Sequence, residues 1–313
     1  YIAPGQGSSL RVSWQFPASE DRAVFRFVAR PDSFQVGDSI YPYTIDSVAI
    51  GVALVARDST VKGLTIFLYR MPATVDSTVS FTDLDTAFTA ANLVDSVIVP
   101  DTILTDGFER MITGVNLPRV AIAAADSGVL ALGVQIRANS GTGVRIGGSA
   151  SGLSAPTFVT YVQVDQTDTV VARTLTRSAN FSRFVSQNPP VFDADLLTVG
   201  GAPSARTILR FPWPLFLKDS AQLIRATLEL IPTAPIPGLN GDTAFVQSRP
   251  LLADLGSKSP ASSDGLFFAF TPVVAGQTDT VRIEVRRALV LWQGDDPLPP
   301  AFLLQLLPEG SSF

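Results

Sequence analysis

The stretch VLALGVQIRA, from Val129 to Ala138, decides the fold class of this chain. Every second side chain in it is large and apolar, namely those of Leu130, Leu132, Val134 and Ile136. That spacing places the four side chains on one face of an extended strand. The 23 glycines and 23 prolines are spread along the whole chain, as expected of many short strands joined by turns. The sequence therefore predicts an all-β protein.

Other stretches carry the same signal. AFLLQLLP (301–308) has apolar residues in phase, and GLTIFLYRM (63–71) is apolar on both faces, which is typical of a strand buried on two sides. TVRIEVRRALVLW (280–292) begins by alternating apolar and charged residues and predicts a half-buried antiparallel strand. The best helical candidate is FTDLDTAFTAANLVD (81–95), in which Asp83 is expected to cap a short helix over 84–93.

The chain also repeats itself at a spacing of about 170 residues. Three matches occur in the same order along the two halves: DSVAIGVALV (46–55) with DSAQLIRATLEL (219–230), Ile112 with Ile283, and Gln135 with Gln305. Because three matches in order are stronger than one, we interpret the halves as two homologous β domains.

The repeat fixes the expected domain limits. We expect a first β domain over residues 1–165 and a second over 166–313, with the junction within 164–174. Residues 46–55 and 219–230 should then be equivalent strands. The same expectation holds for 112–120 and 283–291.

The second half contains four segments in order: LTVGGAPSARTILRFPWP, KDSAQLIRATLELIP, TDTVRIEVRRALVLWQ and PPAFLLQLLPEGSSF. Together they resemble the DNRLRE, or disaggregatase-related, module of bacterial surface proteins. It covers 193–313 and, more faintly, 10–164, and it departs from the family pattern at Arg282–Val285. The resemblance implies two tandem antiparallel jelly-roll-like β-sandwiches in an exported protein, similar to carbohydrate-binding modules.

Composition excludes several classes of function. The chain has no cysteine and no histidine, so disulfide scaffolds, thiol catalysis, Ser–His–Asp catalysis and cysteine-based metal sites are ruled out. The net charge of −5 and the lack of a basic run argue against nucleic-acid binding. Only 16% of the residues are charged, against about 25% in typical soluble domains. Either a large core explains this, or a partner covers part of the surface.

Pairs of acidic residues are the remaining candidates for catalysis or metal binding. The densest are Asp83 with Asp85, Asp193 with Asp195, and Asp295 with Asp296. None lies in a recognisable calcium-loop motif, so we expect solvated turn acids. The chain is predicted to be no enzyme, with no catalytic, cofactor-binding or metal-binding residues. A structural calcium ion, which similar jelly-roll modules often hold, is the one cofactor left open.

Four aromatic side chains are candidate platforms for stacking on sugar rings: Trp213, Tyr41, Tyr43 and Tyr69. Trp213 lies between two prolines, which stop strand pairing on either side of it. We favour the structural alternative, in which Trp213 plugs one end of a sandwich. Trp292, at the end of an alternating stretch, is interpreted as structural for the same reason.

Two functions remain open on the sequence. The favoured one is a non-enzymatic structural or protein-interaction role in the bacterial cell envelope or at its surface, with a sparsely charged β surface docked on other protein subunits. The alternative is a pair of carbohydrate-binding modules of a secreted glycan-active system, and a carboxylate-dependent polysaccharide-cleaving enzyme is the least favoured. Coplanar exposed rings would favour a glycan, whereas an apolar patch without such rings would favour a protein.

Export is expected from two features. The sequence begins at Tyr1 rather than Met, which favours a removed leader and a periplasmic, cell-surface or extracellular location. The longest apolar run, VAIGVALVA (48–56), is about half the length of the 18 or more residues that a membrane span requires.

The second half is shorter than the first after the matched glutamines. Gln135 is followed by the strand PTFVTYVQV (156–164), whereas Gln305 is followed only by LLPEGSSF. A sandwich without that strand exposes unpaired backbone groups and part of its core. We expect the strand to come from a continuation beyond Phe313, which we favour, or from another chain by strand addition.

Overall fold

The computed structural model describes residues 9–16, 19–120, 128–188, 195–201, 204–219, 221–240, 242–294 and 298–307. The chain divides into two compact units, Tyr1–Pro189 (unit 1) and Pro190–Phe313 (unit 2). Each unit is described by itself below. Strands hold 49% of the residues and helices 11%, which confirms the predicted all-β class.

Unit 1 is built mainly of long antiparallel strands. Its strands are β1 (Ser9–Trp14), β2 (Asp21–Phe27), β3 (Phe34–Val36), β4 (Ser39–Tyr41), β5 (Tyr43–Arg57), β6 (Thr65–Met71), β7 (Leu93–Ile98), β8 (Asp106–Ile112), β9 (Leu130–Arg137), β10 (Thr142–Gly147), β11 (Thr157–Gln166) and β12 (Thr169–Ser186). Its helices are α1 (Phe81–Asp85) and the 3-10 turns η1 (Ala90–Asn92), η2 (Gly114–Val120) and η4 (Gly152–Ser154).

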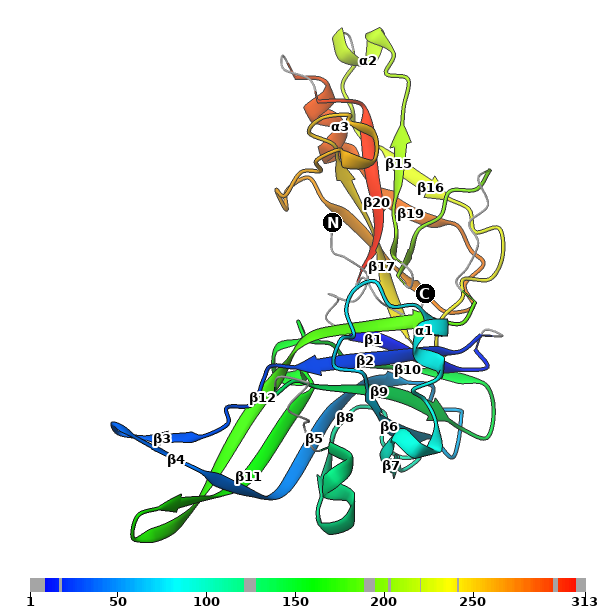
Figure 1. Cartoon of the computed structure of the whole chain (residues 1–313). Coiled ribbons are helices and arrows are strands. Elements are labelled where there is room, and N and C mark those ends of the chain that lie inside the picture. Colours follow the sequence, from blue (N-terminus) through cyan, green and yellow to red (C-terminus); the bar gives the residue numbers. More distant parts are fainter. Residues whose placement is uncertain are drawn as a thin grey trace. The chain divides into compact units, whose positions relative to one another are not determined.

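Most of these strands belong to one hydrogen-bonded sheet in the order β1-β10-β5-β11-β12-β2-β9-β6-β7, with β8 on the other edge of β5. β5, β11 and β12 lie side by side, as Figure 1 shows. β12 pairs β11 along its first half and β2 along its second, with a register shift between Ala179 and Phe181. A further residue pair, Ser13 with Asp21, links β1 to β2. The strands therefore surround a shared core whose largest fully buried side chains include Phe25, Phe27, Phe158, Leu132 and Ile146.

A buried ion pair lies where β1 meets β2. Asp21 is 1% exposed, and its Oδ2 lies 2.5 Å from Nε of Arg11. The Ser13 hydroxyl donates to the same oxygen at 2.6 Å, and the Ser186 hydroxyl donates to Oδ1. The Arg11 Nε–H is not aligned for a hydrogen bond, so the guanidinium acts on Asp21 mainly through its charge. Asp21 thus joins β1, β2 and β12 through one carboxylate.

Unit 2 has shorter strands and smaller sheets. Its strands are β13 (Gly200–Gly201), β14 (Ser204–Ala205), β15 (Thr207–Arg210), β16 (Thr227–Leu230), β17 (Thr243–Pro250), β18 (Ala269–Val274), β19 (Val281–Glu284) and β20 (Ala301–Leu307). Its helices are α2 (Leu215–Asp219), α3 (Arg286–Trp292) and the 3-10 turn η5 (Gly256–Lys258). The sheets are β15-β20-β17-β18, β16-β19 and β13-β14. Their core includes Val246, Ile283, Trp292, Phe302 and Leu306.

The described strands of the two units pair in matching order. Unit 1 contains β2-β9-β6-β7 and the pair β5-β8, and unit 2 contains β15-β20-β17-β18 and the pair β16-β19. The matched strands also follow one another in the same order along the chain. Phe67 lies opposite Gln135 just as Gln247 lies opposite Gln305, and both glutamines of the predicted match are buried.

The structure corrects the predicted junction. Residues 164–174 form the turn between β11 and β12, and the division between the units falls after Pro189 rather than after residue 165. β12 is rich in β-branched and polar residues and pairs strands of unit 1 along its whole length, so it cannot begin the second unit.

Two predicted strand segments are partly helical. Of 112–120, only Ile112 is strand and 114–120 is η2; of 283–291, the strand ends at Glu284 and α3 begins at Arg286. In α3 the buried residues are Ala288 and Trp292, which are four apart and therefore share one helical face. Of 219–230, only β16 is strand.

The predicted short helix is also different. α1 covers Phe81–Asp85, and its N-cap is Ser80 rather than Asp83. The Ser80 side chain accepts from the Asp83 N–H, while the Asp83 carboxylate accepts from the Ser80 N–H at 2.9 Å. Asp83 is thus the third residue of a capping box.

Candidate functional site

An apolar patch lies on the outward face of β17 and β18 in unit 2. In these strands Ala244, Val246 and Val273 point into the core. Neighbouring side chains along a strand point to opposite sheet faces. The outward face therefore carries Phe245, Phe270 and Val274, which we call the outer patch.

The outer patch is well exposed for such large apolar side chains. Phe245, Phe270 and Val274 are 38%, 63% and 47% exposed. The two phenyl rings meet edge to face, with centroids 6.0 Å apart and planes at 90°. The β17–β18 connection adds three more exposed apolar side chains: Leu252, Leu255 and Leu266. A solvated sheet face normally carries polar side chains, and these exposed apolar side chains depart from that pattern.

Unit 1 has polar residues at the matching positions. In β6, Thr65 lies two residues before Phe67, and in β17 Phe245 lies two residues before Gln247. Across the sheet, Ser96 lies opposite Phe67, and Phe270 lies opposite Gln247. The same sheet position therefore carries Thr65 and Ser96 in unit 1 but two phenylalanines in unit 2. The sequence did not identify Phe245 as an outward residue. Its neighbours Ala244 and Val246 are also apolar, so the pattern does not show which of the three side chains faces the core.

Trp213 lies against the core of unit 2 rather than standing free. Its ring packs edge to face on Trp292, with centroids 5.3 Å apart, and it contacts the core as a partly buried side chain. Trp292 itself is 2% exposed, as expected for a structural tryptophan. Trp213 therefore packs within its own unit, and its part as a plug at the end of a sandwich stays a prediction.

Tyr69 is a core residue of unit 1. It is 8% exposed, its ring packs edge to face on Phe88, and its hydroxyl donates to Oε1 of Gln135 at 3.2 Å. Burial raises the pKa of the Tyr69 phenol above its ordinary value. The ring has no face free for a sugar.

Tyr41 and Tyr43 lie close together in unit 1 and are half-buried. Tyr41 pairs Phe34 in the β3–β4 hairpin. The Tyr43 hydroxyl donates to the Pro31 carbonyl at 2.5 Å, and the Arg30 guanidinium lies 5.6 Å from its ring centroid. Partial burial raises the pKa of the Tyr43 phenol, against the opposing positive charges of Arg30 and Arg177. Of the four candidate platforms, the structure brings together these two.

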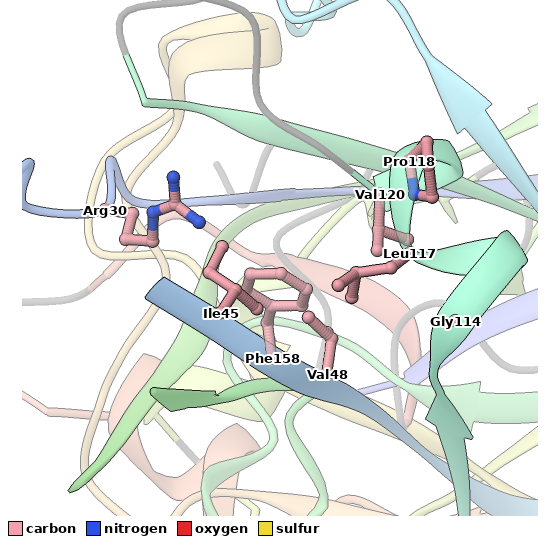
Figure 2. A pocket seen from close by; sticks show the side chains of 8 residues that line it. All are labelled: Arg30, Ile45, Val48, Gly114, Leu117, Pro118, Val120 and Phe158. Atoms are coloured by element: carbon pink, nitrogen blue, oxygen red, sulfur yellow. The ribbon is translucent and has the colours of Figure 1, made fainter. Parts of the chain in front are cut away.

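A small pocket of about 340 Å³ lies beside this region (Figure 2). Arg30 is the one charged residue among its lining residues, and the remainder are Ile45, Val48, Gly114, Leu117, Pro118, Val120 and Phe158. The lining residues other than Arg30 come from β5, η2 and β11. Among the described lining residues, none offers a group suited to acid–base or nucleophilic chemistry, and their side chains suit an apolar moiety.

The members of the acidic pairs that the structure describes have ordinary structural roles or are exposed. Asp83 belongs to the capping box, and Asp85 forms an ion pair with Arg22 at 2.8 Å. Asp193, Asp295 and Asp296 lie outside the described residues, whereas Asp195 is exposed. Within the described ranges, no group of three or more Asp or Glu residues is close enough together to hold a metal ion.

Comparison with known proteins adds no identification. No protein-family model matches the chain, and neither a curated protein nor a solved structure is found to be similar to it. The resemblance to the DNRLRE module therefore stays a prediction. In the part of the chain that the structure covers, no helix is long and apolar enough to cross a membrane.

Proposed function

We propose that this protein is a non-enzymatic structural or interaction protein, exported to the bacterial cell envelope or surface, where it docks on other protein subunits through unit 2. The outer patch is the observation that carries the proposal. Contact with a partner would bury the two exposed phenyl rings and the valine of this sheet face. Burial of apolar surface is the main favourable term in protein association.

The distribution of exposed apolar residues supports unit 2 as the docking unit. Although unit 2 is the smaller, more of the large exposed apolar side chains belong to it than to unit 1. Beyond the outer patch and its neighbouring leucines they are Leu196, Leu197, Leu215, Phe216, Ile224, Ile231 and Val290. Exposed apolar residues in this number favour a surface that another protein covers.

The geometry gives less support to glycan binding. Sugar platforms are flat, and the rings of Phe245 and Phe270 stand at 90° to each other. Trp213 and Tyr69 are occupied by contacts within their own cores. Apolar protein side chains need no flat platform and can pack against the exposed parts of both rings.

The double substitution Phe245→Ser and Phe270→Ser is expected to release the protein from its native assembly. Both side chains are exposed, so the variant should stay folded while losing the apolar contact. The measurement is the size of the tagged full chain in mild-detergent extracts of its source cells, by sedimentation. Wild type is expected well above the mass of a single copy of the tagged protein, and the variant near that mass.

Val170→Ser is the matched control, because Val170 is 60% exposed but lies in unit 1. It should sediment with the wild type. A wild-type protein that sediments as a single chain would contradict the proposed function. A double variant that keeps the full assembly would show that docking does not use the outer patch.

A further inference from the structure

The edge of β16 that faces away from β19 has no strand partner among the described residues. The Val285 N–H donates to the Ala226 carbonyl, and Thr227 lies opposite Glu284 in the β16–β19 register. In an antiparallel pair, hydrogen-bonded and non-hydrogen-bonded residues alternate. The backbone N–H and C=O groups of Thr227 and Glu229 therefore point away from β19, toward the open edge.

Unit 1 shows what occupies this edge in the matching strand. β5 pairs β8 as β16 pairs β19, with Val48 opposite Ile112 and Leu228 opposite Ile283. The other edge of β5 is filled by β11, in which Phe158 pairs Ile50 and Thr160 pairs Val48. β5 is therefore paired on both sides, whereas β16 is paired on one.

The apolar residues of β16 are also less buried than the matching residues of β5. Val48 and Ile50 are 2% and 1% exposed, whereas Leu228 and Leu230, at the matching positions, are only partly buried. Leu228 and Leu230 already contact the core of unit 2 from one side. Just beyond each end of β16, Ile224 and Ile231 are 84% and 77% exposed. Exposed apolar side chains thus lie near both ends of β16.

We propose that β16 accepts an extended strand from a partner polypeptide, which runs antiparallel to it and has an apolar or small residue at every second position. The model for that strand is β11, whose inward side chains Phe158, Thr160, Val162 and Val164 are all nearly fully buried. The incoming strand hydrogen-bonds to Thr227 and Glu229 and covers Leu228 and Leu230. This inference deepens the proposed function and rests on it, since it names the form in which a partner binds.

A second copy of this chain is a poorer occupant than a longer strand. β16 is four residues long, and pairing it with another β16 would end before Ile224 and Ile231 are covered. An antiparallel pair centred on Glu229 would also place two carboxylates opposite each other, which is destabilising. A strand of the length of β11, ten residues, extends past both ends of β16.

The test uses the full chain and a fluorescent synthetic peptide of the β11 sequence TFVTYVQVDQ as the probe. Fluorescence anisotropy measures binding, and hydrogen exchange follows the amides of β16. We expect saturable binding, with slowed exchange at Thr227 and Glu229. Thr227→Pro removes an edge-facing N–H but no bond to β19, so it should weaken binding about tenfold or more. Thr227→Val keeps the N–H and should bind as the wild type does.

Several results would overturn the proposal. These are no binding of the peptide, equal binding by the proline and valine variants, or a concentration-dependent dimer that the proline variant abolishes. Slow exchange of both edge amides before the peptide is added would also overturn it, because it would show that the favoured continuation beyond Phe313 fills the edge from within the same chain. Phe245→Ser with Phe270→Ser should still bind the peptide. Loss of the native assembly in that double variant, with peptide binding retained, therefore tests the outer patch separately from β16.

Discussion

Replacing Asp21 with alanine is expected to lower the free energy of unfolding of unit 1 by about 3–5 kcal/mol, because it leaves a buried guanidinium without its counter-charge. The Arg11 side chain is 11% exposed, so water replaces little of the lost interaction. The hydroxyls of Ser13 and Ser186 lose their acceptor in the same step. The substitution should therefore loosen the junction of β1, β2 and β12 together.

Hydrogen exchange under urea, followed at the amides of β2 and β9, measures this loss within unit 1. A whole-chain unfolding curve is less suitable, because a protein with two units need not unfold in one step. Arg110→Ala is the control in the same unit: it removes the partly exposed ion pair with Asp95 at 3.0 Å, whose contribution is about 0–1 kcal/mol. A loss of stability below about 1 kcal/mol for Asp21→Ala would contradict the role of this carboxylate in joining β1, β2 and β12.

The second large effect is expected at Gly147, the last residue of β10. A Cβ atom at this position would lie 1.8 Å from the Ser154 carbonyl oxygen and 2.8 Å from its carbon. These are backbone atoms, so no side-chain rotation relieves the contact. Gly147→Ala should therefore destabilise unit 1 by about 3 kcal/mol, at the upper end of the range for overpacking.

Gly107→Ala is the matched control, because Gly107 also lies in a strand of unit 1, and a Cβ there meets nothing within 4 Å. Its effect should stay within about 0.5 kcal/mol. Hydrogen exchange under urea, followed at amides of unit 1, compares the two variants directly. Equal losses of stability would show that η4 moves freely away from β10, contrary to the close approach of Ser154 to Gly147.

The strands with a clear period of two could be predicted from the sequence. β9 and β20 lie within VLALGVQIRA and AFLLQLLP, and alternation identifies them because one face of each strand must pack on the core. β6 lies within GLTIFLYRM, which is apolar on both faces and was predicted from that continuous run instead. The matched pair Gln135 and Gln305 also proved to occupy corresponding positions in the two pairing orders.

The helix α3 could not be predicted as readily. Residues Val281 to Val285 alternate as a strand does, and the apolar residues after them fit either period. The signal for a helix was the spacing of Ala288 and Trp292, and short apolar runs leave this choice open. The end of β19 at Glu284 depends on packing that the local sequence does not contain.

The candidate site was harder still. Whether an aromatic ring is a platform or a core residue depends on what lies over it, as Tyr69 and Trp213 show. Conversely, Phe245 and Phe270 became candidates only once the register placed both on the outward face, with Phe245 opposite Pro272 and Phe270 opposite Gln247. Chain topology, rather than residue type, decides which rings are exposed.

Site-specific photo-crosslinking in the source cells tests the central claim most directly. Benzoylphenylalanine would replace Phe270 in the outer patch and, in a second strain, Ile98 in unit 1, which is 73% exposed. The account predicts a discrete protein adduct from position 270, identified by mass spectrometry, and none from position 98. An adduct to polysaccharide, no adduct at position 270, or the same adducts from both positions would contradict it.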